Sequence, residues 1–508
     1  MATAGMATAH AQVNQKPAAK DSIEKPTVTV KDSASVSSKG QPKMTLQECI
    51  ATALQNNLTI RRAAYNIESY KVTKLTSWGA FLPTLNTSLT YGRNYGRSIN
   101  PVTNAFYNGV VKSYNPSLQA QLTLFNGFRL HYNYLASKKN IEAADLDFEK
   151  AKNDVIINVA GYYVTVILNR ELYENAKVQL LSSQQQLGRI KLQVEAGALP
   201  KSNELNQEAI VATNETNMIN QENTLNISLL QLKQAMQVPA STPLDVVIPD
   251  LSVEEMVIDQ TPEEIYAVSA KTLPQIKSAL LKVESAELAY KAARGSYLPR
   301  LTIGGSMTTN YSSASDYIPI IVPTGYGVAT TPVAQVGPSD SGVPTTDPTQ
   351  LIYSIQPTGY TQTGTERYNV HDQFKNNLYK SVGVTLSVPI MNGFNTRAGV
   401  RNAEINREVA RLTVTDNENQ LRQSIETAYN NALAAAKTYA ASVKQVQYSE
   451  EAYRMTKIRL DNGAANFVEY QISANDLFSA RSNLARSKYN FILTKKIIDF
   501  YQGKPIDY

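Results

Sequence analysis

The sequence is poor in residues that build covalent cross-links and metal sites. Its 508 residues include one cysteine, Cys49, and three histidines, His10, His131 and His371, which are far apart in the chain. One thiol cannot form an internal disulfide or a zinc site. Leu46-Gln47-Glu48, which precedes the cysteine, is not the small-residue lipobox of an acylated lipoprotein. We interpret Cys49 as a small buried residue on a helix.

Catalytic signatures are missing as well. The sequence contains no Gly-x-x-x-x-Gly-Lys phosphate loop, no His-Glu-x-x-His zinc pair and no Gly-x-Ser-x-Gly nucleophile elbow. We therefore predict that the protein is not an enzyme and has no catalytic residues, no cofactor and no metal site. Energy for any transport must come from a partner.

Long apolar runs and concentrated charge are also lacking. The longest apolar candidate, Val159–Leu168, falls short of the roughly 18–20 residues that a membrane helix needs. Residues 1–43 carry +3 of the formal net charge of +6, and the +3 spread over the rest of the chain is too dilute to indicate nucleic-acid binding.

The amino-terminal residues have no helical or strand pattern. Ala9-His10-Ala11 resembles a signal-peptidase site, so we interpret residues 1–11 as a signal-peptide remnant. Residues 12–43 are rich in Lys, Ser and Val without any period, and we interpret them as a disordered tail.

The rest of the chain contains a sequence pattern that occurs twice. Three pairs of segments carry it: Asn126-Gly127-Phe128 with Asn392-Gly393-Phe394, Gly197-Ala198 with Gly463-Ala464, and Phe81-Leu82-Pro83 with Tyr297-Leu298-Pro299. The first two pairs are 266 positions apart and the third is 216 apart. We predict a tandem structural repeat at residues 44–240 and 261–505, joined by a linker at 241–260, with about 50 extra residues in the second copy.

Each repeat contains two segments in which apolar and small polar residues alternate. We expect strands at about 82–95 and 115–125 in the first repeat, and at about 299–311 and 379–389 in the second. Leu118, Ala120 and Leu122, for example, alternate with Gln119 and Gln121. This period of two is typical of transmembrane barrels, and the alternative is a half-buried sheet of a soluble domain.

The strands are flanked by helical patterns. Each repeat begins with a helix, and we expect long helices at about 127–195 and 393–461 and shorter ones at about 202–237 and 467–502. Between Phe128 and Glu195 there is no proline, and apolar residues step by three and four as in coiled coils. A single helix of this length would span about 100 Å.

Four strands are too few to close a barrel. Known membrane barrels need about 8 strands or more, and an open strand edge is not tolerated in lipid. Two copies would give an 8-stranded barrel filled by its own side chains, whereas three leave room for a pore. The sequence thus predicts an α+β membrane protein, a trimeric 12-stranded β-barrel continued by a long α-helical coiled-coil barrel.

Two kinds of turn stand out as candidate sites. At the strand–helix junctions, Asn126-Gly127 and Asn392-Gly393 suit left-handed conformations, and asparagine can cap the following helix. At the far ends of the long helices lie Ala196-Gly197-Ala198 and Asn462-Gly463-Ala464. They fit helix C-caps, and we expect them also to form a distal mouth where a partner approaches.

The repeat, the strand–Asn-Gly-Phe–helix junctions and the glycine turns resemble the TolC family of outer-membrane efflux and secretion ducts, over about residues 44–505. The resemblance implies a homotrimer in the lipid of a Gram-negative outer membrane, with its helical tunnel in the periplasm. It also implies that the tip turns dock a periplasmic adaptor (membrane fusion) protein. An inner-membrane RND or ABC pump would drive cargo through this passive duct.

The resemblance also implies a gate. In the family, acidic residues after the second tip turn form a constricting ring; here Glu469 takes the first position and Ile472 replaces the second. The positions of the family's closed-state latch are Asn203 and Ala465 here. We expect three Glu469 side chains to repel one another and to favour cations. The alternative is a solvated helix-start glutamate stabilised by the helix dipole.

Some alternatives remain open at the level of sequence. A trimeric coiled-coil adhesin or scaffold without a channel would explain the helices but not the strands. The cargo could be a drug, a metal ion or a polypeptide, and either pump class fits. The loops at about 92–114 and 312–378 are expected outside the cell, the longer one either disordered or folded as a lid.

Overall fold

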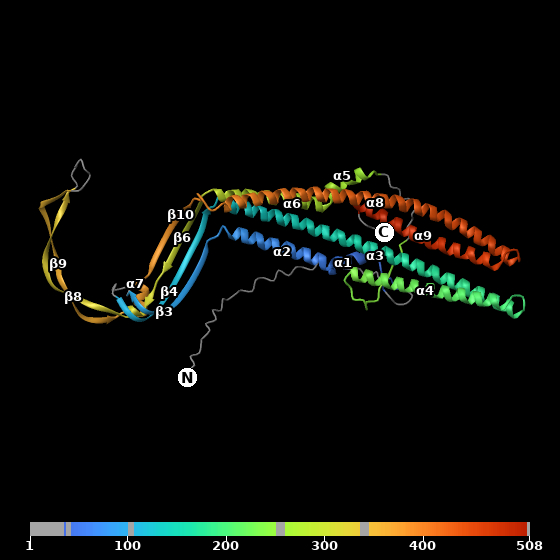
Figure 1. Cartoon of the computed structure of the whole chain (residues 1–508), viewed down its shortest axis with the longest axis horizontal. Helices are drawn as coiled ribbons and strands as arrows, with labels where there is room; N and C mark the ends of the chain where they lie inside the picture. Colours follow the sequence, from blue (N-terminus) through green and yellow to red (C-terminus); the bar gives the residue numbers. More distant parts are fainter. Residues whose placement is uncertain (1–34, 37–41, 100–105, 250–259, 336–344, 505–508) are drawn as a thin grey trace, which may run out of the picture. The chain divides into compact units, whose positions relative to one another are not determined.

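The computed structural model describes residues 35–36, 42–99, 106–249, 260–335 and 345–504. The signal-peptide remnant expected at 1–11 and most of the tail expected at 12–43 lie outside these residues. Helices dominate, and the strands gather into a few antiparallel groups and one small parallel contact (Figure 1).

The chain packs as two compact units. The first contains residues 1–52, 162–251 and 507–508, and the second contains 53–161 and 252–506. The first unit comprises most of helix α1, the end of α3, helix α4 and a small sheet. Their bounds are α1 Leu46–Asn56, α3 Arg129–Glu195, α4 Lys201–Ala235, β1 Ser35–Val36, β2 Pro42–Met44 and β5 Asp245–Val246.

In the first unit, α4 runs back along the end of α3. The buried Gln207 amide of α4 donates to the carbonyl oxygen of Ser183 on α3 at 2.9 Å. Near the turn, Lys191 and Glu208 form an ion pair across the two helices at 3.0 Å. Both contacts join residues of the same helical hairpin, which is closed by a short turn after Glu195.

The small sheet is anchored to α3 by the buried Tyr163 and the partly buried Arg170. The Tyr163 hydroxyl donates to the carbonyl oxygen of Val247 at 2.6 Å. Arg170 is ion-paired with Asp245, and its guanidinium also donates to the Val246 carbonyl at 3.2 Å. Burial lowers the pKa of Arg170, so this guanidinium depends on its carboxylate partner.

The disordered interpretation of the amino-terminal tail is wrong at its end. Strand β2, Pro42–Met44, pairs in parallel with β5, Asp245–Val246, and β1 pairs with β2. The expected linker at 241–260 therefore contains a strand. These strands are only two or three residues long, too short for a period-two pattern to reveal them.

In the second unit, four long strands form an antiparallel sheet in the order β10-β6-β4-β3 (Figure 1). Their bounds are β3 Thr84–Ile99, β4 Phe106–Phe125, β6 Arg300–Thr308 and β10 Tyr379–Ser387, with the short β7 Tyr311–Ser312 beside β4. Thr84 lies opposite Gln121 in one hairpin, and Arg300 lies opposite Ser387 in the other. The second pair follows from the first by the sequence offsets of the repeat, because Arg300 lies 216 positions after Thr84 and Ser387 lies 266 positions after Gln121.

The region at 312–378, whose order the sequence left open, forms a two-stranded ribbon in its described part. Strands β8 Tyr317–Gln335 and β9 Thr345–Arg367 pair antiparallel, and α7 Val370–Asn376 follows. The wholly buried Gln373 of α7 holds the base of the ribbon. Its side-chain oxygen accepts from the Ser312 amide at 3.0 Å, and its nitrogen donates to the Tyr368 carbonyl at 3.1 Å.

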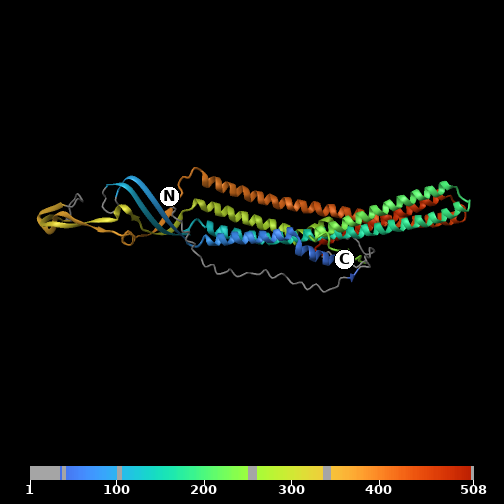
Figure 2. The same ribbon diagram turned by 90° about the horizontal axis from the view of Figure 1, so that it is seen from below.

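Besides its strands, the second unit contains a set of helices that pack against one another. They are α2 Leu58–Gly79, α5 Pro262–Thr272, α6 Pro274–Arg294, α8 Asn395–Asp461 and α9 Phe467–Tyr501, with single 3-10 turns at Gly295–Tyr297 and Ser313–Ser315. Helix α9 runs back along α8, and α6 lies beside α8 (Figure 2). Ile265, Ile276, Leu421, Ile425 and Ile498 are the main members of the core that joins α5, α6, α8 and α9.

The first helix of each repeat is broken. The helix expected at the start of the first repeat divides at Asn57, whose side chain accepts from the Thr59 amide at 2.8 Å and caps α2. In the second repeat the break lies at Leu273, because Pro274 begins α6 and has no amide proton for a continuing helix. The proline was a sequence signal for this break.

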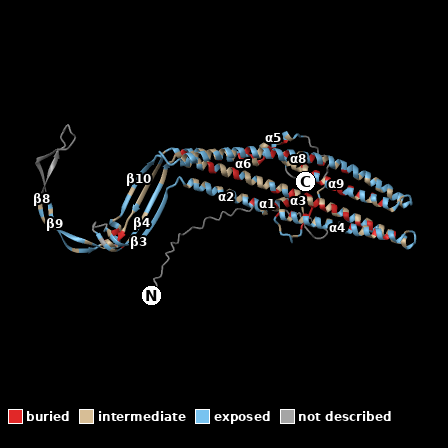
Figure 3. Cartoon of the chain, viewed as in Figure 1, coloured by how far each residue is buried: buried red, intermediate tan, exposed pale blue. Residues whose placement is uncertain are grey.

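Burial is uneven between helices and strands. Buried residues concentrate on the helices, whereas nearly all side chains of β3 and β10 are exposed on both faces (Figure 3). Cys49 is fully buried on α1, which confirms its interpretation, and burial raises the pKa of its thiol to about 12. Among the described residues, no helix is both long and apolar enough to span a bilayer.

The Arg170–Asp245 pair should contribute measurably to stability. Replacing Asp245→Asn leaves the partly buried guanidinium without its counter-charge, and we expect a loss of about 2 kcal/mol in the free energy of unfolding. Urea unfolding followed by circular dichroism measures it. The matched control is Asp154→Asn on the same helix, whose ion pair with Lys150 is exposed and should matter by less than about 0.5 kcal/mol. Equal losses in the two variants would contradict this prediction.

Candidate functional site

The turn after α8 is a tight helix C-cap. Gly463 has a φ of 72°, and its amide donates to the Leu460 carbonyl at 3.0 Å. The next amide, of Ala464, donates to the Arg459 carbonyl at 2.7 Å. This pair of hydrogen bonds defines a Schellman motif, which satisfies the last carbonyls of the helix.

The turn after α3 has the same geometry. Gly197 has a φ of 71° and donates to the Val194 carbonyl at 3.0 Å, while Ala198 donates to the Gln193 carbonyl at 2.8 Å. A Cβ at Gly197 or Gly463 would meet nothing within 4 Å. Glycine is therefore required at these positions by the left-handed backbone conformation, and not by a lack of room for a side chain. Ala196 and Asn462 precede these glycines as the first residues after the helices, and both turns are exposed.

Glu469 lies in the first turn of α9, where Asn466 is the N-cap. The Glu469 amide donates to the Asn466 side-chain oxygen at 2.8 Å, and the Asn466 amide group donates to the carboxylate at 3.3 Å. Both the helix-start interpretation and the gate hypothesis are compatible with this position, since the Glu469 side chain remains about half exposed, at 47%.

The Glu469 carboxylate also has a cationic partner that sequence reasoning missed. A guanidinium nitrogen of Arg459, in the last turn of α8, lies 3.5 Å from the carboxylate and donates to the Ala464 carbonyl at 3.1 Å. A basic residue in the last turn of a helix was the available signal. The negative charge of Glu469 is thus partly balanced within its own chain.

The residues around the two turns differ in detail. Tyr470, buried behind Glu469, contacts Tyr453 of α8 with hydroxyl oxygens 3.0 Å apart. Ile472 is exposed, and Ala465 is half-buried. On α4, Asn203 precedes the buried Glu204, which pairs with Lys201 at 2.7 Å and raises the pKa of that lysine.

At the strand–helix junctions the left-handed residues are glycine and phenylalanine. Gly127 and Phe128 have φ values of 69° and 62°, and Gly393 and Phe394 have 61° and 63°. The expectation that asparagine would be left-handed here is wrong.

At each junction the asparagine side chain accepts a hydrogen bond from the amide of the second residue of the long helix. The Asn126 side chain accepts from the Leu130 amide at 3.3 Å, and the Asn392 side chain accepts from the Thr396 amide at 3.5 Å. The N-cap of α8 itself is Phe394, which makes no side-chain cap hydrogen bond, so asparagine as the helix cap stays a prediction. An exposed phenylalanine at positive φ is uncommon, and it is repeated at both junctions.

The first junction packs against the backbone of the second repeat. A Cβ at Gly127 would lie 2.1 Å from the Gly295 carbonyl oxygen, and a Cβ at Gly295 would lie 2.2 Å from the Gly127 oxygen. Only glycine permits so close a backbone contact. A cavity of about 590 Å³ beside it is lined by Asn126 and Gly295 on one side and by Asn392 on the other.

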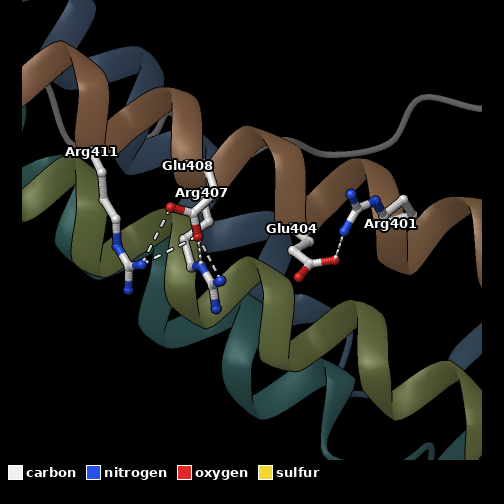
Figure 4. A network of polar contacts seen from close by, with 5 residues as sticks. All are labelled: Arg401, Glu404, Arg407, Glu408 and Arg411. Atoms are coloured by element: carbon white, nitrogen blue, oxygen red, sulfur yellow. Dashed lines mark hydrogen bonds and ion pairs between the residues drawn. The ribbon is translucent and has the colours of Figure 1, made fainter.

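Beyond the second junction, α8 carries a network of exposed charges (Figure 4). Arg401 pairs with Glu404 at 2.7 Å, and Glu408 receives hydrogen bonds from Arg407 and Arg411. The hydrogen bond from Arg407 lowers the pKa of Glu408. Arg407 also lies over the ring of Tyr290 on α6, 4.8 Å from its centroid, so this face of α8 is turned towards α6.

In the part of the chain that the structure describes, no three His, Cys, Asp or Glu side chains come together as metal ligands would. The candidate site therefore consists of two helix-end turns, one glutamate–arginine pair and two junctions. These features set the backbone conformation at the helix ends and position charged groups. They do not place a nucleophile beside a general base.

Comparison with known proteins identifies relatives. The sequence model of the family described as "Outer membrane efflux protein" matches residues 49–237 and 355–495. The alkaline protease secretion protein AprF of Pseudomonas aeruginosa is 22% identical over 461 residues, 89% of this chain and 82% of the relative. The probable efflux pump outer membrane protein SepC of Pseudomonas putida is 23% identical over 267 residues, 52% of this chain and 54% of the relative.

The fold is also found among solved structures. The crystal structure of CusC, described in connection with transmembrane channel formation, superposes with a TM-score of 0.68 at 14% identity and covers 91% of this chain and 92% of its own. At this level of identity the likeness shows a shared fold.

The N-cap of α9 should control the order of the second turn. Asn466→Ala removes the acceptor for the Glu469 amide, a change that costs about 1 kcal/mol at helix starts. Amide hydrogen exchange of residues 467–472 should accelerate several-fold. Asn475→Ala is the control, because its side chain pairs only with Gln471 in the exposed interior of the same helix. If both variants exchange at the wild-type rate, the cap does not order this turn.

Proposed function

The chain belongs to the outer membrane efflux protein family, and we propose that it is the outer-membrane exit duct of a tripartite efflux pump or a type I secretion system. It is a TolC-type outer-membrane channel, so the resemblance drawn from the sequence is confirmed. The duct conducts its cargo passively, and its residues perform no catalytic step. The family match over both helical regions is the observation that carries this proposal.

The assembly in this proposal is a homotrimer with a 12-stranded barrel. The four long strands supply one third of such a barrel, and the described part of the sheet ends in the two strands β3 and β10. The common register of the two hairpins supports a tandem repeat. Three chains would then form the helical tunnel in the periplasm, with the ribbon of β8 and β9 outside the cell.

The tip turns are the proposed docking site for a periplasmic adaptor. Ala196-Gly197-Ala198 and Asn462-Gly463-Ala464 are exposed and share one backbone geometry. Such a turn offers backbone groups without bulky side chains. An inner-membrane RND or ABC pump would act through this adaptor.

The proposed gate combines Glu469 with Arg459. If both side chains face the lumen, the glutamate attracts cations and the arginine opposes it, so the net selectivity depends on their balance. This differs from a purely acidic ring because each carboxylate has a guanidinium partner 3.5 Å away.

Planar bilayer recordings of the purified protein test both the channel and its gate. We expect discrete conductance steps, whereas a coiled-coil scaffold without a channel would give none. Reversal potentials in a salt gradient should show lower cation preference for Glu469→Gln and higher cation preference for Arg459→Gln. If neither substitution moves the reversal potential, these side chains face away from the lumen.

The role of the tip turn can be tested in cells. Deleting the gene should abolish export of its cargo, and wild-type protein should restore it. Gly463→Val forces a β-branched residue into a left-handed conformation, which costs about 1–2 kcal/mol, and should restore export poorly despite normal amounts in the outer membrane. Ala464→Val is the matched control in the same turn. Full export by Gly463→Val would exclude this turn from docking.

A further inference from the structure

The cavity beside the Gly127–Gly295 contact lies where the sheet of the second unit meets its helices (Figure 1). Its volume is about 590 Å³, and its walls come from the first turn of α3, the turn between α6 and β6, the segment after β10 and the start of α8. More than half of the lining residues are polar or basic, and none of them is acidic. This junction cavity is therefore suited to a ligand that carries negative charge.

Two arginines supply the positive charge of the junction cavity. Arg129 begins α3 and Arg300 begins β6. None of the ion pairs within the described residues involves either guanidinium. Arg300 donates to the Thr123 hydroxyl at 3.4 Å, which leaves most of its N–H groups for another partner. Two like charges on one cavity repel each other, and a bound anion would offset that repulsion.

The two arginines do not follow from the tandem repeat. The residue 266 positions after Arg129 is Asn395, and the residue 216 positions before Arg300 is Thr84. Both counterparts are uncharged, although the backbone around the two junctions is similar. The repeated architecture therefore does not require these charges, and we look for their role in the cavity itself.

An exposed apolar segment borders the junction cavity. Strand β4 continues to Phe125, whose counterpart is Met391, whereas β10 ends at Ser387. Val388 and Pro389, which follow β10, line the cavity. The next two residues, Ile390 and Met391, are 94% and 93% exposed. A ligand with a phosphate group and an acyl chain would use both surfaces, whereas a free phosphate ion would use only the basic one.

The surroundings of the cavity are basic as well. The segments that meet at the two junctions are residues 72–92, 115–141, 288–308 and 379–403. Together they contain ten lysines and arginines and no aspartate or glutamate. Basic residues at the edge of a membrane attract anionic phospholipids.

Exposed aromatic side chains lie at the same level of the second unit, at the boundaries between helices and strands. They are Trp78, Phe81, Phe128, Tyr297 and Phe394. Aromatic girdles of this kind mark the two interfaces of a membrane barrel. In the proposed duct, the ends of the strands next to the helices lie at the interface with the periplasm.

We propose that the junction cavity binds the headgroup phosphate of a phospholipid from the outer-membrane leaflet that faces the periplasm. Arg129 and Arg300 bind the phosphate, and the acyl chains lie against Ile390 and Met391. The Thr396 hydroxyl, which accepts from the Asn392 amide group, keeps its own proton for the phosphate. This inference rests on the proposed outer-membrane duct. The lipid would connect α3 of the first repeat with β6 and α8 of the second.

Native mass spectrometry of the full-length protein, freed of lipid in detergent, tests the site. Wild-type protein titrated with dioleoyl phosphatidylglycerol should bind it saturably. Arg129→Gln combined with Arg300→Gln removes two charge-assisted contacts and should weaken binding by about ten-fold or more. Lys138→Gln combined with Arg397→Gln is the matched control, because it removes two exposed charges from the same segments outside the cavity. Equal losses in the two double variants would overturn the site.

Two further arms identify the ligand as a lipid. Dioleoylglycerol, which lacks the phosphate, should not bind, and millimolar inorganic phosphate should not displace phosphatidylglycerol. Ile390→Ser combined with Met391→Ser alters only fully exposed side chains and should weaken binding of the phospholipid several-fold. Displacement by inorganic phosphate, or unchanged binding in this variant, overturns the assignment to a phospholipid.

Planar bilayer recordings separate this inference from the proposed function. Arg129→Gln combined with Arg300→Gln should still give discrete conductance steps, because neither residue belongs to the proposed gate. A wild-type protein that conducts but binds no phosphatidylglycerol overturns the lipid site and leaves the exit duct intact. A wild-type protein that binds the lipid and never conducts overturns the duct and leaves the lipid site in place.

Discussion

Backbone groups in a strand need partners on both sides, and within the described sheet β3 and β10 each have a neighbour on one side only. This constraint governs much of the second unit. Most side chains of these strands are exposed on both faces, and α2 and α8 carry exposed apolar residues. Each of these features is costly for a chain alone in water or lipid. Pairing of either edge with a further strand would satisfy its outward-facing backbone donors and acceptors.

A different constraint shapes the helix-end turns. A pair of helices joined by five residues must reverse direction and still satisfy its last carbonyls, and both turns do so with one left-handed glycine. The solution is the same in both repeats, yet the charges differ. Arg459 and Glu469 join the two arms at the second turn. At the first, Lys191 pairs with Glu208 across the arms, and Lys201 pairs with Glu204 on a single helix. Similar backbones thus present different electrostatic surfaces.

Much of the architecture could be predicted because its signals are long. The proline-free stretch from Phe128 to Glu195 indicated α3, and alternation around Leu118–Leu122 indicated β4. Features that are short, or that depend on tertiary contacts, could not be predicted. Strand β5 has two residues and is defined by its contact with β2 and Arg170. The positive φ of Phe128 is imposed by the junction and opposes the residue's own preference. Arg459 was missed because its partner lies across a turn.

The ribbon of β8 and β9 has an unusual chemical consequence. From Leu301 to Glu366 the chain contains no lysine and no arginine, although it holds exposed tyrosines such as Tyr317, Tyr326 and Tyr360. A trypsin-like protease has no cleavage site in these residues, and an amine-reactive label has nothing to modify. Enzymes that cleave after aromatic residues, and reagents directed at phenols, find several targets. If this ribbon faces the medium, proteases that cleave after lysine or arginine cannot cut these residues, whereas proteases that cleave after aromatic residues can.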